Sequence, residues 1–113
     1  MDFFSGRAEY KPTLVNAIKF NLLWKKTNNN LFIDKWDGDP KKTWFKYDGN
    51  ECLGFKTADI SFNLNHGKND VEFINGRHRT RWQLQNNKSS IAIGLDEQGF
   101  KNAKLLGLEP RRV

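Results

Sequence analysis

The sequence predicts an α+β domain, or a closely related α/β arrangement, in which a small mixed β-sheet is combined with two or three helices. Residues 71–95 run from an apolar strand through a glycine turn and a cationic stretch into a polar helix and a second apolar strand. Residues 14–64 contain short apolar runs separated by turns rich in Asn, Asp, Gly and Pro. Residues 96–106 carry apolar side chains at helical spacing.

Length and composition are those of one domain covering residues 1–113. Nine Phe and four Trp supply a large apolar area for a single core. The formal net charge of +6 favours acidic partners such as nucleic acid or phosphates. The single cysteine, Cys52, excludes an internal disulfide and a Cys-rich zinc site, and we expect a partly buried structural thiol.

The N-terminal residues show no cationic segment followed by a long apolar run. No window approaches the roughly eighteen apolar residues that a membrane-spanning helix needs. We therefore expect a cytoplasmic protein that does not insert into a membrane.

Two periods fit residues 17–25. The even-numbered apolar residues from Ile18 to Trp24 alternate as in a strand, whereas Leu14, Ile18 and Leu22 keep helical spacing. We favour the strand.

Turn residues mark the boundaries of the other elements that we expect before residue 71. We expect, in order, an irregular lead at 1–12, a turn at 28–30, a returning hairpin strand at 31–33, a strand at 43–47 between turns at 37–40 and 48–50, and a half-buried strand at 60–64.

After residue 71, helices and strands alternate. We expect a strand at 71–74, a helix at 78–87 and a strand at 91–95. A helix at 96–106 follows, whose acidic first turn and later lysines complement the helix dipole. Gly107 is a plausible C-cap before a basic tail at 107–113.

The most specific pattern is the turn before the helix at 78–87. An Asn-Gly pair supplies a tight turn, and three arginines and a histidine follow where a helix should begin. Unpaired N–H groups at a helix start carry the positive end of the dipole, and arginine adds bidentate donors. We predict a phosphate- or nucleic-acid-binding site formed by Asn75, Gly76, Arg77, His78, Arg79 and Arg81.

A family resemblance rests on the same residues. The segment 73–79, Phe-Ile-Asn-Gly-Arg-His-Arg, followed by Trp82 and the strand at 91–95, resembles the phosphate-binding segment of the ParB/sulfiredoxin-like fold. It is most similar to the plasmid fertility-inhibition and oncogenic-suppression proteins, over about residues 70–96. Sulfiredoxins carry a nucleophilic cysteine where this chain has Arg77, so sulfiredoxin activity is not expected.

The resemblance implies a small inhibitor encoded by a mobile element. It implies a site for nucleotide or DNA phosphate at the loop and a block of conjugative DNA transfer through a type IV secretion system. A secretion-system ATPase is then a candidate partner. The fold also includes kinases and nucleases, so it does not by itself select a chemistry.

Each side chain of the loop admits a role. Arg79 matches the arginine that closes the family motif, and as an exposed clamp it should tolerate Arg79→Ala with less than about 1 kcal/mol lost in stability. Arg77 and Arg81 would extend the field, although a plain solvated position fits Arg81 equally well. His78 is a candidate acid, base or phosphate donor, or it only packs at the helix start.

Three classes of function stay open. One is the fertility-inhibition-like factor, acting by DNA or ATPase binding or as a nuclease. Another is a protein-binding inhibitor, including of a host defence complex, whose basic face is a decoy for nucleic acid. The third is a kinase-like enzyme that uses ATP or another nucleotide with magnesium.

Weak ATPase or DNase activity would require a carboxylate near the phosphates to hold magnesium. The spacing singles out none among Asp34, Asp37, Asp59, Asp70 and Glu72. His66 has no partner at ligand spacing, so no metal site is predicted there.

Aromatic residues alternate with lysines at 24–26, 35–36 and 41–46. Such segments can stack on bases while lysines meet phosphates. We prefer to place Trp24 and Trp44 in the core with the lysines at its rim.

Overall fold

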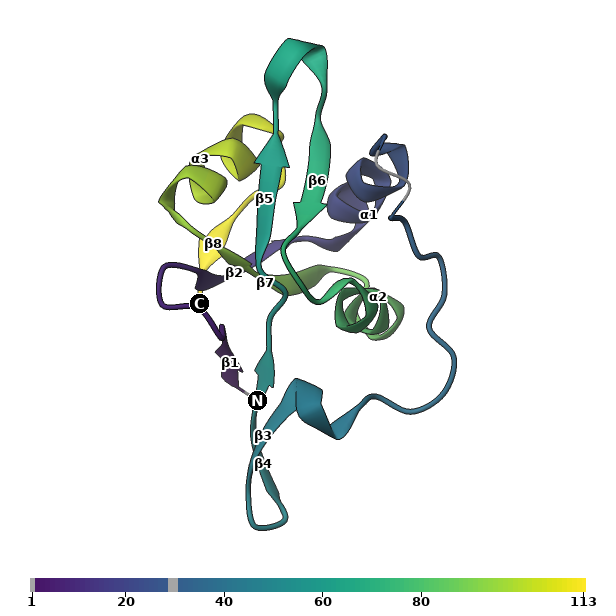
Figure 1. Ribbon diagram of the computed structural model, residues 1–113, viewed down its shortest axis with the longest axis vertical. Coiled ribbons are helices and arrows are strands. Elements are labelled where there is room, and N and C mark those ends of the chain that lie inside the picture. The colour runs from purple at the N-terminus through teal and green to yellow at the C-terminus, as the bar shows by residue number, and fades with distance from the viewer. Residues whose placement is uncertain (1, 29–30) are drawn as a thin grey trace.

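The computed structural model describes residues 2–28 and 31–113, and over these residues the chain forms an α+β fold with three α-helices and small mixed sheets (Figure 1). The predicted fold class is confirmed. The elements are β1 (Asp2–Phe4), β2 (Lys11–Asn16), α1 (Ala17–Lys26), η1 (Lys42–Trp44), β3 (Phe45–Asp48), β4 (Glu51–Lys56), β5 (Ile60–Asn63), η2 (Asn65–Gly67), β6 (Asp70–Phe73), α2 (Arg77–Asn86), β7 (Ser90–Leu95), α3 (Glu97–Leu105) and β8 (Arg111–Arg112).

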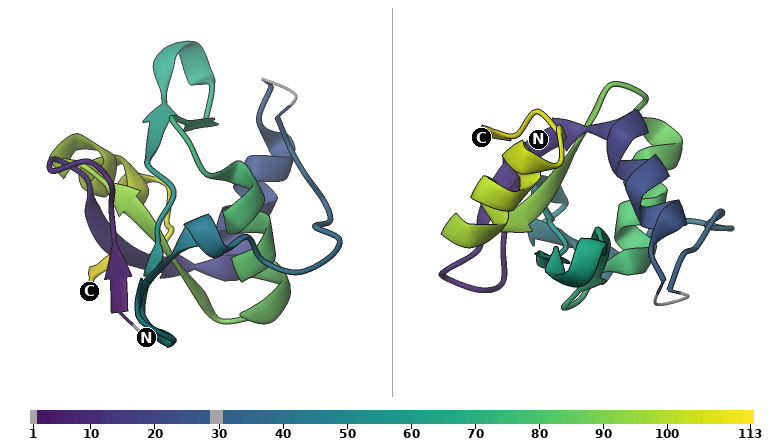
Figure 2. Two further views of the ribbon diagram at one scale, coloured as in Figure 1. Left: turned by 60° about the horizontal axis from the view of Figure 1, so that its bottom comes forward. Right: turned by 90° about the horizontal axis from the view of Figure 1, so that it is seen from above.

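The strands form three small sheets. One has the order β1-β4-β3, with β1 parallel to β4, and another has the antiparallel order β7-β2-β8. The third is the antiparallel pair β5-β6. Figures 1 and 2 show α3 on one side of the β2–β7 pair and α1 with α2 on the other.

Hydrogen bonds from two other segments cover the edge of β7 that faces away from β2. The side-chain amide of Gln83 donates to the carbonyl oxygen of Ala92 (2.7 Å) and accepts from its N–H (2.9 Å). The N–H of Gly94 donates to the carbonyl oxygen of Ala58 (2.6 Å), and Asp59 forms a parallel bridge with Gly94. A helix side chain and a piece of irregular backbone thus take the place of a further strand.

The core lies between the β2–β7 pair, the β5–β6 pair and the helices. Trp24 is fully buried at its centre, where its ring lies 5.2 Å from that of Phe32 and 4.8 Å from that of Phe73, measured between centroids. Trp44 is also buried, so both tryptophans are core residues as predicted. The other large buried apolar residues include Val15, Phe20, Phe55, Ile60, Val71, Ile91, Ile93, Leu95 and Leu108.

The strand predicted at 17–25 is wrong, because this segment is helix α1. The side chain of Asn16 caps the helix by accepting from the N–H of Lys19 (3.0 Å). The buried face consists of Ala17, Phe20 and Trp24, at helical spacing. Ile18 and Leu22, which supported both readings of the sequence, are 64% and 49% exposed, so the alternating pattern combined exposed residues with residues that the core selects.

Two other expectations before the motif also fail, and the basic tail contains a short strand. The irregular lead at 1–12 contains β1 and the beginning of β2, where Pro12 lies inside the strand and accepts through its carbonyl oxygen from the N–H of Val113 (3.2 Å). Residues 31–33 form no strand, and the tail at 107–113 contains β8, which pairs with β2. The expected turn at 28–30 extends into residues 29–30, which lie outside the described part of the chain.

The strand expected at 43–47 begins two residues later as β3, because Lys42–Trp44 form η1, and β4 was not predicted. The elements from residue 60 onward are predicted more closely. The ends of α2, β7 and α3 agree with the predicted elements to within one residue. Gly107 adopts a left-handed φ of 72°, and the N–H of Leu108 donates to the carbonyl oxygen of Ala103 (3.0 Å), which closes α3 as a C-cap. None of the described helices is both long enough and apolar enough to cross a bilayer.

The cap at the start of α1 gives a first prediction. Asn16→Ala removes the acceptor for the N–H of Lys19 and should lower the free energy of unfolding by about 1 kcal/mol. Asn16→Ser keeps an acceptor for the N–H of Lys19, so it should recover most of the stability that Asn16→Ala loses. Recovery should be incomplete because serine cannot replace the hydrogen bond from Asn16 to Glu109. Urea denaturation measures both variants, and equal losses for Ala and Ser would contradict the capping role.

Candidate functional site

The turn between β6 and α2 is fixed by Gly76. Its φ of 82° lies in the left-handed region, and a Cβ at this position would lie 2.7 Å from the Cβ of Ala58 and 2.6 Å from Cζ of Arg79. A side chain is thus excluded both by backbone conformation and by packing. Gly76 offers no side-chain cap, so the first N–H groups of α2 have no capping acceptor from it.

Asn75 points into the protein rather than toward a ligand. Its Oδ1 accepts from the backbone N–H of Asp59 (2.9 Å), and its Nδ2 donates to Oδ2 of Asp59 (2.9 Å). Both ends of the amide are therefore used to join the turn to the segment before β5.

Arg79 also supports the turn from inside. Its Nε donates to the carbonyl oxygen of Lys56 (2.9 Å), and its Nη2 donates to the carbonyl oxygen of Thr57 (3.0 Å) and to Oδ1 of Asn75 (2.7 Å). Burial lowers the pKa of the guanidinium, and the nearby carboxylate of Asp59 opposes that shift. Only Nη1 has no hydrogen bond within the described residues, so Arg79 is first of all a structural residue.

Arg81 lies on the other flank of α2. Its Nη2 donates to Oδ1 of Asn21 (2.6 Å), its Nε donates to the carbonyl oxygen of Ile33, and its guanidinium lies 5.1 Å from the ring centroids of Trp24 and Phe32. With 6% of the residue exposed, it is not a solvated surface residue. Arg81 therefore does not lie with residues 75–79 in one binding site, as the sequence predicted.

Arg77 and His78 are the side chains of the motif that remain available. Arg77 is half-buried, and its guanidinium has no hydrogen-bond or ion-pair partner among residues 2–28 and 31–113. The exposed ring of His78 lies against that of Trp36, with 5.4 Å between centroids. Burial first, then the charges of Arg77 and Lys41, lower the pKa of His78.

A cation and an aromatic ring that the predicted site omitted complete what we call the cationic patch, formed by Arg77, His78, Trp36 and Lys41. Nζ of Lys41 lies 5.8 Å from the ring centroid of Trp36. The backbone of Trp36 is fastened to α2 by two hydrogen bonds with Gln85 (2.6 and 3.1 Å). The lysine–tryptophan pattern at 35–46 was the signal, but nothing in it indicated contact with α2.

An aromatic row lies behind the patch. The ring centroid of Trp36 is 5.1 Å from that of Trp44, which is 6.2 Å from that of Trp82. Trp82 in turn stacks on Phe55, with 5.5 Å between the ring centroids. The row gives the patch a rigid apolar base.

The candidate magnesium carboxylates are separated in the structure. Asp59 is fully buried, where Oδ1 accepts from Oγ of Ser5 (2.6 Å), and Asp70 is buried and accepts from the N–H of Asn28 (3.2 Å). Asp34, Asp37 and Glu72 are exposed. No three His, Cys, Asp or Glu side chains within the searched part of the chain are grouped to hold a metal ion, and the side chain of His66 lies outside the described structure.

Arg79 and Arg77 give a second prediction, which replaces the expectation that Arg79→Ala is nearly neutral. Arg79→Ala leaves two backbone carbonyls and Asn75 without their donor, and should lower the free energy of unfolding by about 3 kcal/mol. Arg77→Ala removes a side chain without such partners and should change it by less than about 0.5 kcal/mol. Chemical denaturation compares the two, and equal stabilities would show that Arg79 does not support the turn.

Comparison of the chain with protein-family models, with curated proteins and with solved structures finds no significant match. The ParB/sulfiredoxin-like resemblance and the fertility-inhibition family therefore stay predictions based on residues 70–96. The cationic patch is the feature of the turn that bears on function.

Proposed function

We propose that this chain is a small cytoplasmic inhibitor that binds the phosphates of DNA or a nucleotide at the cationic patch and, like the family it resembles, blocks conjugative DNA transfer. The supporting observation is the uncompensated charge at the start of α2. Neither Arg77 nor Lys41 forms an ion pair with a described carboxylate, and after burial their charges lower the pKa of His78. A site that holds cations together without a counter-ion favours a phosphate.

The recognition chemistry follows from the elements of the patch. Arg77 supplies a planar donor fork, Lys41 a point charge, and the start of α2 unpaired N–H groups with the positive end of the dipole. Trp36 adds an aromatic surface beside these groups, which suits a single strand whose bases are free to stack. Binding of this kind requires no catalytic step.

A protein-binding inhibitor is the second candidate, favoured by the β3–β4 hairpin. Tyr47 and Leu53 on this hairpin are 46% and 39% exposed, and Lys46 lies beside them. Figure 1 shows the hairpin projecting from the end of the molecule opposite the β5–β6 connection. Such a projection can insert into a partner, and a complex formed there would depend weakly on salt, unlike phosphate binding.

Charge removal at the patch gives a third prediction. Arg77→Ala and Lys41→Ala should each weaken binding of a fluorescent single-stranded oligonucleotide by about 1 kcal/mol and reduce the salt slope by about one. Lys101→Ala, on the exposed face of α3, makes the same change in net charge and should have less effect. Anisotropy titrations at several salt concentrations, and thermal shifts with ATP and CTP with and without magnesium, provide the measurements.

The result separates the candidates. Loss of both DNA binding and inhibition of plasmid transfer from cells that express Arg77→Ala would support the proposal. Equal weakening by Lys101→Ala would reduce the effect to net charge. Inhibition of transfer that survives Arg77→Ala and Lys41→Ala, but is lost on Tyr47→Ala, would contradict the proposal in favour of a protein partner.

The titration of His78 gives a fourth prediction. Because the pKa of His78 is lowered, the fold favours the neutral ring, so this contribution to stability is complete above pH about 6.5 and is lost as the pH falls through the folded-state pKa. A bound phosphate reverses the preference, so oligonucleotide affinity should rise as the pH falls through that window. NMR titration of the imidazole with and without oligonucleotide checks this, and His78→Gln should abolish the pH dependence. An unchanged pKa on binding would exclude His78 from the interface.

A further inference from the structure

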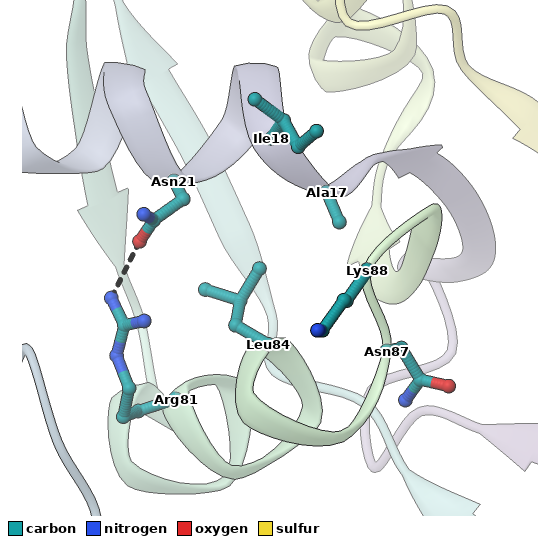
Figure 3. A pocket seen from close by; sticks show the side chains of 7 residues that line it. All are labelled: Ala17, Ile18, Asn21, Arg81, Leu84, Asn87 and Lys88. Atoms are coloured by element: carbon teal, nitrogen blue, oxygen red, sulfur yellow. Dashed lines mark hydrogen bonds between the residues drawn. The ribbon is translucent and has the colours of Figure 1, made fainter.

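A separate pocket of about 220 Å³ lies between α1 and α2 (Figure 3). None of the four residues of the cationic patch lines it. Ala17, Ile18 and Leu84 form its apolar part, and Asn21, Arg81 and Lys88 bring polar atoms to it. The pocket thus combines aliphatic side chains with two cations.

The pocket contains a buried cation without a counter-ion. Arg81 is 6% exposed, yet no carboxylate of the described residues lies within ion-pair distance of it. Its partners are one backbone carbonyl, the Asn21 amide and two aromatic faces. Burying a charge is costly unless it is paired, and here burial lowers the pKa of Arg81 while the carboxylate of Asp34 opposes that shift from beyond ion-pair distance.

Donors of this guanidinium remain unused. Arginine has five N–H donors, and Nη1 makes no hydrogen bond within the described chain, whereas Nη2 donates to Asn21. Figure 3 shows the second terminal nitrogen turned toward Leu84, away from the hydrogen bond to Asn21. A free donor edge therefore borders the pocket.

Lys88 lies across the apolar floor from Arg81. Figure 3 shows its amino group projecting into the space between the helices, with Leu84 between the two cations. Lys88 is exposed and has no ion pair with any residue that the structure describes. Its charge adds to the positive field at the mouth of the pocket without neutralising Arg81.

We propose that this pocket binds a carboxylate carried on a short aliphatic chain. The carboxylate accepts from the free edge of Arg81 and supplies the missing counter-ion, and the aliphatic part lies on Leu84, Ala17 and Ile18. Planar donors match a carboxylate, and the aliphatic lining favours a group that is only partly hydrated. The same chemistry is offered by a free branched-chain carboxylate and by the C-terminus of a peptide that ends in leucine.

The first arm of the test compares a charged probe with its neutral isostere. Isovalerate should shift the NMR resonances of the Asn21 and Leu84 side chains in a saturable way, whereas isovaleramide should bind at least about tenfold more weakly, as expected for loss of a charged hydrogen bond. Acetyl-Ala-Ala-Leu with a free and an amidated C-terminus distinguishes the sources: tighter binding of the free-acid peptide than of isovalerate assigns the pocket to a peptide end, and the reverse assigns it to a small molecule. Equal binding of acid and amide in both pairs would overturn the proposal.

The second arm changes the pocket. Asn21→Asp places a carboxylate beside Arg81, and should raise Tm while lowering the affinity for isovalerate at least about tenfold, because the counter-ion is then internal. Lys88→Gln should lower the affinity about threefold, and Lys25→Gln, an equal charge change on α1 outside the pocket, should leave it within twofold. Because Lys88 is exposed, its variant decides the question even if Asn21→Asp is unstable. Unchanged affinity in Lys88→Gln, or in a folded Asn21→Asp, would contradict the proposal.

Discussion

The partly buried hydrogen bonds among Asp59, Asn75 and Arg79 hold the turn, β5 and the edge of β7 in one arrangement. Asn75 uses both ends of its amide on Asp59 and also accepts from Arg79. Arg79 continues the network to the carbonyl oxygens of Lys56, the last residue of β4, and of Thr57. Because an unsatisfied buried polar group costs more than an average hydrogen bond contributes, loss of one member leaves the others unpaired. The position of α2, and of everything it carries, depends on this network.

The three arginines of the motif are close in sequence but have different roles. Arg77 and Arg81 are four residues apart and lie on the same face of α2, whereas Arg79 lies on the opposite face and points into the fold. Arg81 contacts α1, and Arg77 stays available because it lies at the helix start. Figure 3 shows the hydrogen bond that Arg81 donates to Asn21 of α1. A run of cations therefore cannot be read as one anion site, and in this chain two of the three side chains contribute to the fold before any ligand is considered.

The elements with strong local signals are the ones that the sequence predicts closely. Gly76, Asp96 and Gly107 mark helix ends through backbone geometry and caps, and the elements around them are predicted closely. The helix at 17–26 was missed because exposed Ile18 and Leu22 suggested periods that the core does not follow. The contact of Trp36 with His78 joins segments 42 residues apart, and no local pattern encodes a partner at that distance. The sequence thus located the turn before α2, but it identified only part of the side chains that form the cationic patch.

The way in which β7 ends the sheet has a consequence for association. An open outer strand presents its alternate N–H and C=O groups to any other extended chain. At Ala92 these groups are taken by Gln83, and at Gly94 the N–H is taken by Ala58. At these two residues the edge of β7 is already hydrogen-bonded within the molecule. Another extended chain could therefore pair with this strand, as in a fibril, only after α2 and residues 58–59 had detached.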